Sequence, residues 1–427
     1  MLTKEQNELI TDVSPGSALN KYWKRFWLPV LRGAALEAGG TPKKVEMLCE
    51  KYVAFRGDNG KVGFLYEACP HRGISLAMGR NENNRLTCIF HGWSFDAEGN
   101  CTNMPTEKDQ SFCSKVKGQG FPVREAGGIV WVYLGEGEPP KFNDYAFTQL
   151  DSIHVRPRAS YNEANWFQNV ETLMDSAHIN LLHNDSTANA DIPQHGLQLT
   201  AGNNTPKYTF EPRPYGLRSY SLRENPTGNQ DYLRVTEYVA PGTAFIGTTD
   251  AEAGFVIMVI PVNNTRSLQW YVYWDARQPI NDNLPDFSMD GTDEDDDNFA
   301  ASRQGLPFYG QDREAMKAGK SWTGVPGVIF EDYAVAESIP IVDRTREFLG
   351  SGDLAIVRTR RILLERIKLS TEDKECVFAD EIDYRSLRAL ADLIPKGADI
   401  KEHAYAREAE RRIKLYPADE KTEEATA

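Results

Sequence analysis

Two short pairs of cysteine and histidine stand out in the sequence, Cys69-Pro-His71 and Cys88-Ile-Phe-His91. Thiolate and imidazole groups bind metals, and each pair is short enough for one tight turn to deliver both side chains. A Rieske [2Fe–2S] cluster is held in this way, because two thiolates bind one of its irons and two imidazoles bind the other. The pattern therefore predicts a Rieske cluster on Cys69, His71, Cys88 and His91.

A structural zinc site is the alternative interpretation, since zinc also accepts two cysteines and two histidines. Zinc fingers usually join a pair of cysteines to a pair of histidines, whereas each pair here is mixed. The flanking residues match Rieske loops, with Arg72-Gly73 after one pair and Gly92-Trp93 after the other. These features favour the cluster, which carries one electron at a time.

A second motif of metal-binding type follows at Asp175-x₂-His178-x₄-His183. Two imidazoles and a carboxylate on one side of an iron leave the opposite positions open for dioxygen and substrate. The histidines are five residues apart, which is about 140° around a regular α-helix, so such a helix would not direct both at one metal. We therefore expect a π-bulge or a helix break between His178 and His183. A surface helix with two incidental histidines is the alternative.

The carboxylate ligand has to come from another part of the chain. The best candidate lies in the helix-like stretch 328–338, which has Glu331 and Asp332 near its start. We predict Asp332 as the ligand and Glu331 as the second choice. Acidic residues are also favourable at helix N-termini for electrostatic reasons alone, which is the alternative explanation.

The composition excludes several classes of protein. The 427 residues include 41% hydrophobic and 26% charged residues, as in ordinary globular proteins. The net charge of −14 argues against a nucleic-acid partner. No apolar run reaches the roughly eighteen residues of a membrane span, and the N-terminus lacks the apolar core of a signal peptide. Cys49, Cys101, Cys113 and Cys376 show no pairing pattern, so we expect free thiols in a reducing cytoplasm.

The order of the patterns predicts an α+β chain of three parts. These are an N-terminal helical segment (1–40), an all-β domain around the cluster (41–155) and a catalytic domain (156–427). Strand-like stretches flank the cluster loops at 53–55, 64–66 and 129–134. In the third part an antiparallel meander with helices on one face, a helix-grip (Bet v1-like) arrangement, is predicted from the alternating stretches 207–212, 216–223, 231–239, 254–262 and 267–274. The acidic stretch 286–297 predicts a solvated loop, and the end 418–427 predicts disorder.

With these motifs in place, the chain resembles the oxygenase component of the Rieske non-haem iron aromatic-ring oxygenases, most of all the phthalate dioxygenase-like branch. The resemblance covers nearly the whole chain. Besides the metal motifs it is carried by residues 2–9, 22–23, 27–29, 79–82, 103–107, 124–128, 341–344 and 347–350. Thr172 departs from the branch, which often has glycine there, and this bears on the shape of the pocket.

The resemblance implies cofactors and partners. Each chain is expected to hold a Rieske [2Fe–2S] cluster and a mononuclear non-haem Fe(II), and to assemble as an α₃ or stacked α₃α₃ homo-oligomer in the cytoplasm. A separate NADH-dependent reductase, with flavin and a plant-type [2Fe–2S] centre, is expected to supply electrons. The resemblance also implies that Asp175 links the two redox centres, because it would bond a Rieske histidine of the neighbouring subunit and an iron histidine of its own.

The predicted function is a terminal oxygenase that uses O₂ and reductase-supplied electrons on an aromatic carboxylic acid, by ring cis-dihydroxylation or hydroxylation. O-demethylation of a methoxylated aromatic acid is one alternative, and a Rieske electron carrier without oxygenase chemistry is another. A carboxylate substrate favours an arginine partner. The candidates are Arg218, Arg223 and Arg234 on the predicted meander, and an exposed, salt-bridged arginine is the alternative for each.

Overall fold

The computed structural model of the protein describes residues 1–185, 203–249, 253–280, 299, 305–372, 374 and 382–415. Cys376, the acidic stretch 286–297 and the end 418–427 lie outside the described residues. Among the described helices, none combines the length and the apolar character that crossing a membrane requires.

The chain folds as two compact units. The smaller unit consists of Val13–Phe142 with Ile260–Asn263, and the larger unit of Met1–Asp12, Asn143–Val259 and Asn264–Ala427. These bounds differ from the predicted parts 1–40, 41–155 and 156–427. The N-terminal segment is divided, because helix α1 (Lys4–Thr11) packs on helix α8 (Leu354–Thr371) of the larger unit, whereas strand β1 (Trp27–Arg32) pairs within the smaller one.

The smaller unit is built from short antiparallel sheets, as predicted for the domain around the cluster. The sheets are β1–β10–β9, with β10 at Ile129–Tyr133 and β9 at Val123–Ala126; β2–β3–β4, at Lys43–Met47, Glu50–Arg56 and Val62–Tyr66; and β5–β6–β7–β8, at Arg80–Glu82, Arg85–Thr87, Ser94–Phe95 and Cys101–Asn103. One helix, α2 (Ala18–Trp23), precedes them. Inward-facing side chains of Val53, Phe55, Leu65, Leu86 and Phe95 form a core that also contains Cys69 and Cys88. The two cysteines of the metal motif are therefore anchored in packed apolar surroundings.

A disulfide corrects one expectation of this unit. Cys101 of β8 and Cys113 of the 3₁₀-helix η3 (Gln110–Lys115) are bonded to each other, at a sequence separation of 12. The prediction of free thiols was therefore wrong for these two residues. The pairing depends on how η3 packs beside β8, and the spacing of the cysteines carries no sign of that.

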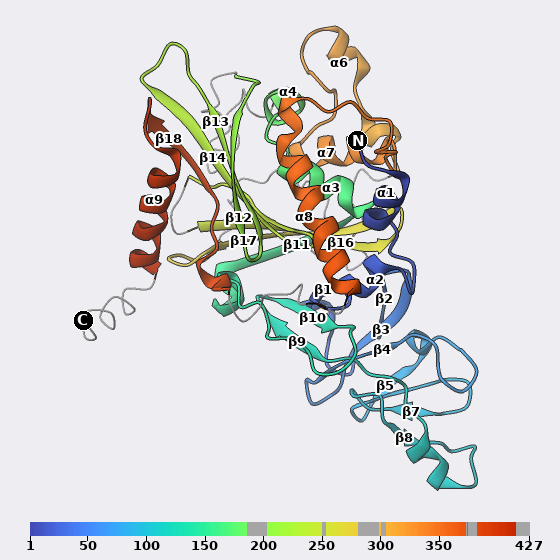
Figure 1. The fold of residues 1–427 in the computed structure, drawn as a ribbon. Helices are drawn as coiled ribbons and strands as arrows, with labels where there is room; N and C mark the ends of the chain where they lie inside the picture. The colour runs from blue at the N-terminus through green and yellow to red at the C-terminus, as the bar shows by residue number, and fades with distance from the viewer. Residues whose placement is uncertain are drawn as a thin grey trace. The chain divides into compact units, whose positions relative to one another are not determined.

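The larger unit is organised around an antiparallel sheet (Figure 1). Among the described residues eight strands take part, in the order β11–β17–β16–β15–β14–β13–β12, and β18 also pairs with β14. Their bounds are β11 Val155–Asn162, β12 Lys207–Arg213, β13 Gly216–Arg223, β14 Gln230–Val239, β15 Thr243–Phe245, β16 Ala253–Asn263, β17 Arg266–Asp275 and β18 Leu390–Pro395. From β12 to β17 each strand neighbours the next one in sequence, so the predicted meander is confirmed.

Helices cover both faces of this sheet, which corrects the expectation of one covered face (Figure 1). On one face lie α3 (Trp166–Met174), α7 (Val328–Glu337) and α8, which pack on one another and on the strands. On the opposite face α9 (Ile400–Leu415) packs through Ala404 on Tyr220, Leu233 and Val235. The chain also forms the short helices α4 (Ile179–Leu182) and α6 (Arg313–Lys317).

Candidate metal centre and its cavity

The two histidines of the second motif flank a single helical turn. Helix α3 starts at the N-cap Asn165, whose side chain accepts from the Phe167 N–H, and ends at Met174. Asp175 is extended (φ −81°, ψ 105°), so the chain leaves the helix there. His178 is the N-cap of α4 and His183 its C-cap, with φ −94° and ψ 26°.

The prediction of a π-bulge or a break between the histidines was wrong, because helix α4 lies between them and helix α3 ends before His178, at Asp175. A regular helix would separate the two side chains widely, and the structure avoids this because both residues lie at helix ends. Backbone dihedrals at helix ends are less constrained than those inside. The two imidazole rings have centroids 5.2 Å apart.

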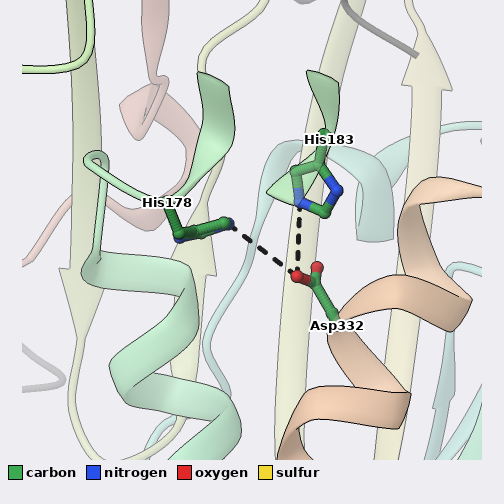
Figure 2. Close-up of side chains that lie close together, drawn as sticks. All are labelled: His178, His183 and Asp332. Atoms are coloured by element: carbon green, nitrogen blue, oxygen red, sulfur yellow. Dashed lines mark ion pairs between the residues drawn. The ribbon is translucent and has the colours of Figure 1, made fainter. Parts of the chain in front are cut away.

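The carboxylate of Asp332 lies close to both imidazoles, and dashed lines mark the two ion pairs in Figure 2. Its Oδ1 lies 3.8 Å from His178 Nε2 and 3.3 Å from His183 Nε2, and one ligand atom from each residue lies within 4.8 Å of the others. Ligand atoms bound at about 2.1 Å and at right angles lie about 3 Å apart, so binding one ion needs little movement. Asp332 Oδ1 is buried without a hydrogen-bond partner in the described part of the chain. Two imidazoles and one carboxylate suit a non-haem iron with open positions.

The charges around His178, His183 and Asp332 favour the binding of a cation. His183 is 3% exposed, and its Nδ1 lies 2.8 Å from Glu331 Oε2. Burial opposes protonation of this imidazole, but the carboxylates of Asp332 and Glu331 outweigh burial and raise the pKa of His183 to about 9. Glu331, the second choice for the ligand, contacts the ring nitrogen opposite the one that faces Asp332.

Beside these three residues lies a cavity of about 80 Å³. This volume is the space open to the centres of water molecules. It holds several waters, since one water needs about 10–15 Å³. Its apolar walls come from Leu173, Ile179, Ile246, Phe255, Ile257, Val328 and Ile329, and its polar walls from Asn169, Thr172, Ser176, Arg234, Thr236, Gln269 and Tyr271. An apolar cavity with a few convergent polar groups next to a metal centre is typical of a substrate site.

The three candidate arginines have different surroundings. Arg234 lines the cavity, and its buried NH1 has no hydrogen-bond partner among the residues described. Arg223 is engaged with the chain next to Asp175, because it donates to the backbone carbonyl and the hydroxyl of Ser176. Both lie on the cavity side, but only Arg234 presents an unpaired donor.

Arg218 lies on the opposite face of the sheet. It forms ion pairs with Glu237 and with Glu408 of α9. The register explains this, because directly opposite residues of an antiparallel pair share a face. Arg218 is opposite Glu237, whereas Arg234 is opposite Ser221. Of the three candidate arginines, Arg234 is therefore the one that lines the cavity.

Gln269 on β17 also lines the cavity, although it is not among the residues predicted from the sequence. Its Oε1 accepts from the Tyr271 hydroxyl at 3.0 Å, and its buried Nε2 is unpaired within the described ranges. The available signal was a polar residue in an otherwise apolar strand, at a position that alternation directs toward the interior.

Asp175 lines the cavity and lies beside His178. Its Oδ2 is 3.6 Å from His178 Nδ1, and its Oδ1 accepts from the Ala177 N–H at 2.7 Å. Burial opposes ionisation, but the interactions with His178 and Ala177 outweigh burial and hold the pKa of Asp175 below its ordinary value. The carboxylate is therefore charged near neutral pH.

The two cysteine loops of the smaller unit have the same backbone pattern. The Cys69 and Cys88 N–H groups donate to the carbonyls of the residues five positions on, at 2.9 and 2.8 Å. Gly73 and Gly92 donate back to Cys69 and Cys88, at 2.8 and 3.0 Å. Both glycines have positive φ (76° and 74°), a conformation that costs other residues energy. The glycine after each pair is therefore part of the loop geometry.

These loops bring the four predicted cluster residues together. Cys69 and Cys88 are buried, whereas His71 and His91 are partly exposed, with ring centroids 4.5 Å apart. Trp93 stacks on His71 at 4.3 Å. Buried thiols below two accessible imidazoles suit a cluster that exchanges electrons through its histidine-bound iron.

Comparison with known proteins identifies two family matches in the chain. Residues 26–118 match the family model of the Rieske [2Fe–2S] domain, and residues 132–424 match that of the LigXa C-terminal domain like family. The chain is 34% identical over 388 residues to the phthalate 4,5-dioxygenase oxygenase subunit of Pseudomonas putida, covering 86% of each chain. It is 30% identical over 424 residues to the 3-chlorobenzoate-3,4-dioxygenase oxygenase subunit of Comamonas testosteroni, covering 93% of this chain and 96% of the other.

A solved structure shows the same fold. Dicamba monooxygenase bound to dicamba superposes with a TM-score of 0.58 at 18% identity, over 82% of this chain and 98% of the other. Together, the Rieske domain, the second family match and the identity over most of each relative show that the chain belongs to the Rieske non-haem iron oxygenases, as an oxygenase subunit.

Proposed function

We propose that this oxygenase subunit acts on an aromatic carboxylic acid at an iron held by His178, His183 and Asp332. The observation that carries the proposal is the unpaired guanidinium N–H of Arg234 in the cavity next to these three residues. Iron at this centre, when bound, supplies the activation of dioxygen. The protein supplies the apolar walls that exclude water and the arginine that orients the substrate.

A carboxylate satisfies Arg234 better than a neutral group does. An unpaired buried donor costs free energy, and a charge-assisted bond between guanidinium and carboxylate is about twice as strong as a neutral hydrogen bond. The aromatic ring would then lie against the apolar walls, whose residues include Phe255 and Ile257. This arrangement favours an aromatic acid over a neutral hydrocarbon.

Electrons are proposed to enter through the cluster held by Cys69, His71, Cys88 and His91, from a separate NADH-dependent reductase with flavin and a plant-type [2Fe–2S] centre. Asp175 is proposed to pass them to His178 from a Rieske histidine of a neighbouring subunit, in a proposed homo-oligomer of α₃ or α₃α₃ type. A charged carboxylate beside His178 supports this role. The cytoplasmic location stays a prediction.

The reaction is tested with purified protein, NADH, a reductase of broad specificity and a panel of benzoates with carboxyl, chloro, hydroxyl or methoxy substituents. We expect substrate-dependent NADH oxidation and a cis-diol or phenol product. Formaldehyde release from methoxybenzoates would identify the O-demethylase alternative. Oxidation of the reduced cluster without any organic product would favour the electron carrier.

Arg234→Met tests the substrate class. Loss of a buried charge-assisted bond costs about 2–3 kcal/mol, so we expect KM for the acid to rise roughly 30–150-fold. The kinetics of a neutral analogue, such as the methyl ester or the amide, should change little. Equal effects on acid and ester would contradict carboxylate binding by Arg234.

A further inference from the structure

Two consecutive acidic residues hold the imidazole of His183 from opposite sides. Glu331 Oε2 lies 2.8 Å from Nδ1, and Asp332 Oδ1 lies 3.3 Å from Nε2. Consecutive residues project about 100° apart from a helix, so neighbours near the start of α7 can reach the two nitrogens of one ring. The ring nitrogen that faces Asp332 belongs to the proposed metal site, and the ring nitrogen that faces Glu331 points away from that site.

Glu331 is a fixed, fully engaged carboxylate. It is 2% exposed, and its other oxygen, Oε1, accepts from the Thr323 hydroxyl at 2.6 Å. The Thr323 oxygen in turn accepts from the Val325 N–H at 3.1 Å. Both oxygens of Glu331 therefore take part in hydrogen bonds with protein groups, and neither points at the proposed metal site.

We propose that Glu331 is a positioning residue, which accepts the Nδ1–H of His183 and thereby directs Nε2 at the iron. This inference rests on the proposed iron site. A carboxylate on the distal nitrogen fixes the tautomer and the orientation of a metal-bound histidine and strengthens it as a donor, and losing such a partner typically weakens metal binding 10–100-fold.

The other histidine has no equivalent support. The distance between His178 Nδ1 and Asp175 Oδ2 is 3.6 Å, which exceeds a hydrogen bond, so His178 Nδ1 has only this longer ion-pair contact and no hydrogen-bond partner in the described part of the chain. His178 is also more exposed, at 20% of its side chain against 3% for His183. The site therefore has one rigid imidazole, oriented by Glu331, and one that can adjust.

The test measures iron retention rather than turnover. Variants Glu331→Gln, Glu331→Ala and Thr323→Val are loaded with Fe(II) without oxygen, and transfer of iron to a ferrous chelator is followed. The two irons of the Rieske cluster serve as the internal standard through its visible spectrum. Glu337→Gln is the matched control, because Glu337 lies on the same helix and accepts hydrogen bonds from Asn162 and Tyr309 but touches no histidine.

The variants should form a graded series. Glutamine can still accept from Nδ1 but carries no charge, so we expect about tenfold weaker iron binding, and up to about 100-fold for alanine. Thr323→Val should have a smaller effect, and Glu337→Gln none. The EPR signal of the ferrous nitrosyl complex should change in shape in Glu331→Gln, because the donor strength of His183 changes.

Wild-type iron retention and an unchanged nitrosyl signal in Glu331→Gln would overturn the inference. If Glu331→Ala does not fold, Glu331→Gln and Thr323→Val decide the question. Complete loss of iron in Glu331→Gln, with Asp332→Ala retaining it, would make Glu331 the ligand and also overturn the inference. A wild-type protein that binds no iron beyond the cluster would instead contradict the proposed function.

Discussion

Small differences in position give neighbouring residues different chemistry in this protein. Glu331 and Asp332 are adjacent, yet both oxygens of Glu331 take part in hydrogen bonds, whereas Oδ1 of Asp332 is buried beside two imidazoles without a hydrogen bond in the described part of the chain. Arg218 and Arg234 lie on adjacent strands, yet one is neutralised by carboxylates and the other faces the cavity. In each pair the local environment, rather than the residue type, decides what the side chain can do.

Asp332→Ala should remove the mononuclear iron and leave the cluster intact. Two imidazoles alone bind divalent iron weakly, because the only anionic ligand of the set is lost. We expect iron content to fall from about three to about two per chain, with no turnover and an unchanged Rieske EPR signal. Iron analysis combined with EPR measures both; retention of the third iron would show that another acid is the ligand.

Arg218→Met should damage stability rather than catalysis. The substitution leaves Glu237, which is 0% exposed, without its charged partner. Removing one member of a buried pair costs about 3–5 kcal/mol. We expect a clear fall in the urea midpoint of the larger unit, whereas Arg234→Met, which breaks no ion pair between described residues, should unfold close to the wild type. A normal midpoint for Arg218→Met would show that Glu237 is accommodated by Tyr215, which also donates to it.

At the scale of elements, the site depends on where helices begin and end. Helix α3 ends at Met174, which releases Asp175 and lets one turn carry both histidines. Helix α7 is preceded by its N-cap Gly327, whose φ of 93° and ψ of 136° are unfavourable for any other residue. The direction in which Glu331 and Asp332 project therefore depends on this glycine.

Gly327→Ala should weaken iron binding although it touches no ligand. A side chain at this backbone conformation costs about 1–3 kcal/mol unless the chain shifts, and a shift would move the first turn of α7. We expect faster iron loss to a chelator with an intact cluster. Gly319→Ala is the control, because Gly319 also has positive φ (67°) but has open space around it and lies in an unrelated turn. Equal iron retention in both variants would contradict the role of Gly327.

At the scale of the whole molecule, each compact unit has its own core and its own redox site. The cysteine loops belong to the smaller unit, and the histidine–aspartate cluster to the larger one. Electron transfer between the two sites is part of the proposed function, and Asp175 is the proposed link.

Asp175→Asn should retain both metals and uncouple them. The amide fills the same space, but it is neutral and cannot accept from an imidazole on each side. We expect oxidation of the pre-reduced cluster by O₂, with substrate bound, to slow by about tenfold or more. Stopped-flow absorbance measures this rate. A rate within about twofold of wild type, with full iron, would exclude the linking role, and loss of iron would make Asp175 a support for His178.

Local patterns in the sequence predicted the parts of the protein that depend on neighbouring residues. The mixed cysteine–histidine pairs predicted the Rieske domain, since one turn supplies both ligands of a pair. Alternation predicted the meander from β12 to β17, because successive side chains of a strand point to opposite faces of the sheet. The assignment of His178, His183 and Asp332 to iron stays a prediction, although the structure brings the three residues together.

Features that depend on distant parts of the chain appeared only in the tertiary structure. The disulfide between Cys101 and Cys113 depends on η3 packing beside β8. The covering of the second sheet face depends on how α9 packs, and the separation of Arg218 from Arg234 depends on strand register. Sequence periodicity says which residues share a face, but not which face meets which partner. Packing decides that, because the free energy of burial depends on all the elements that meet at a surface.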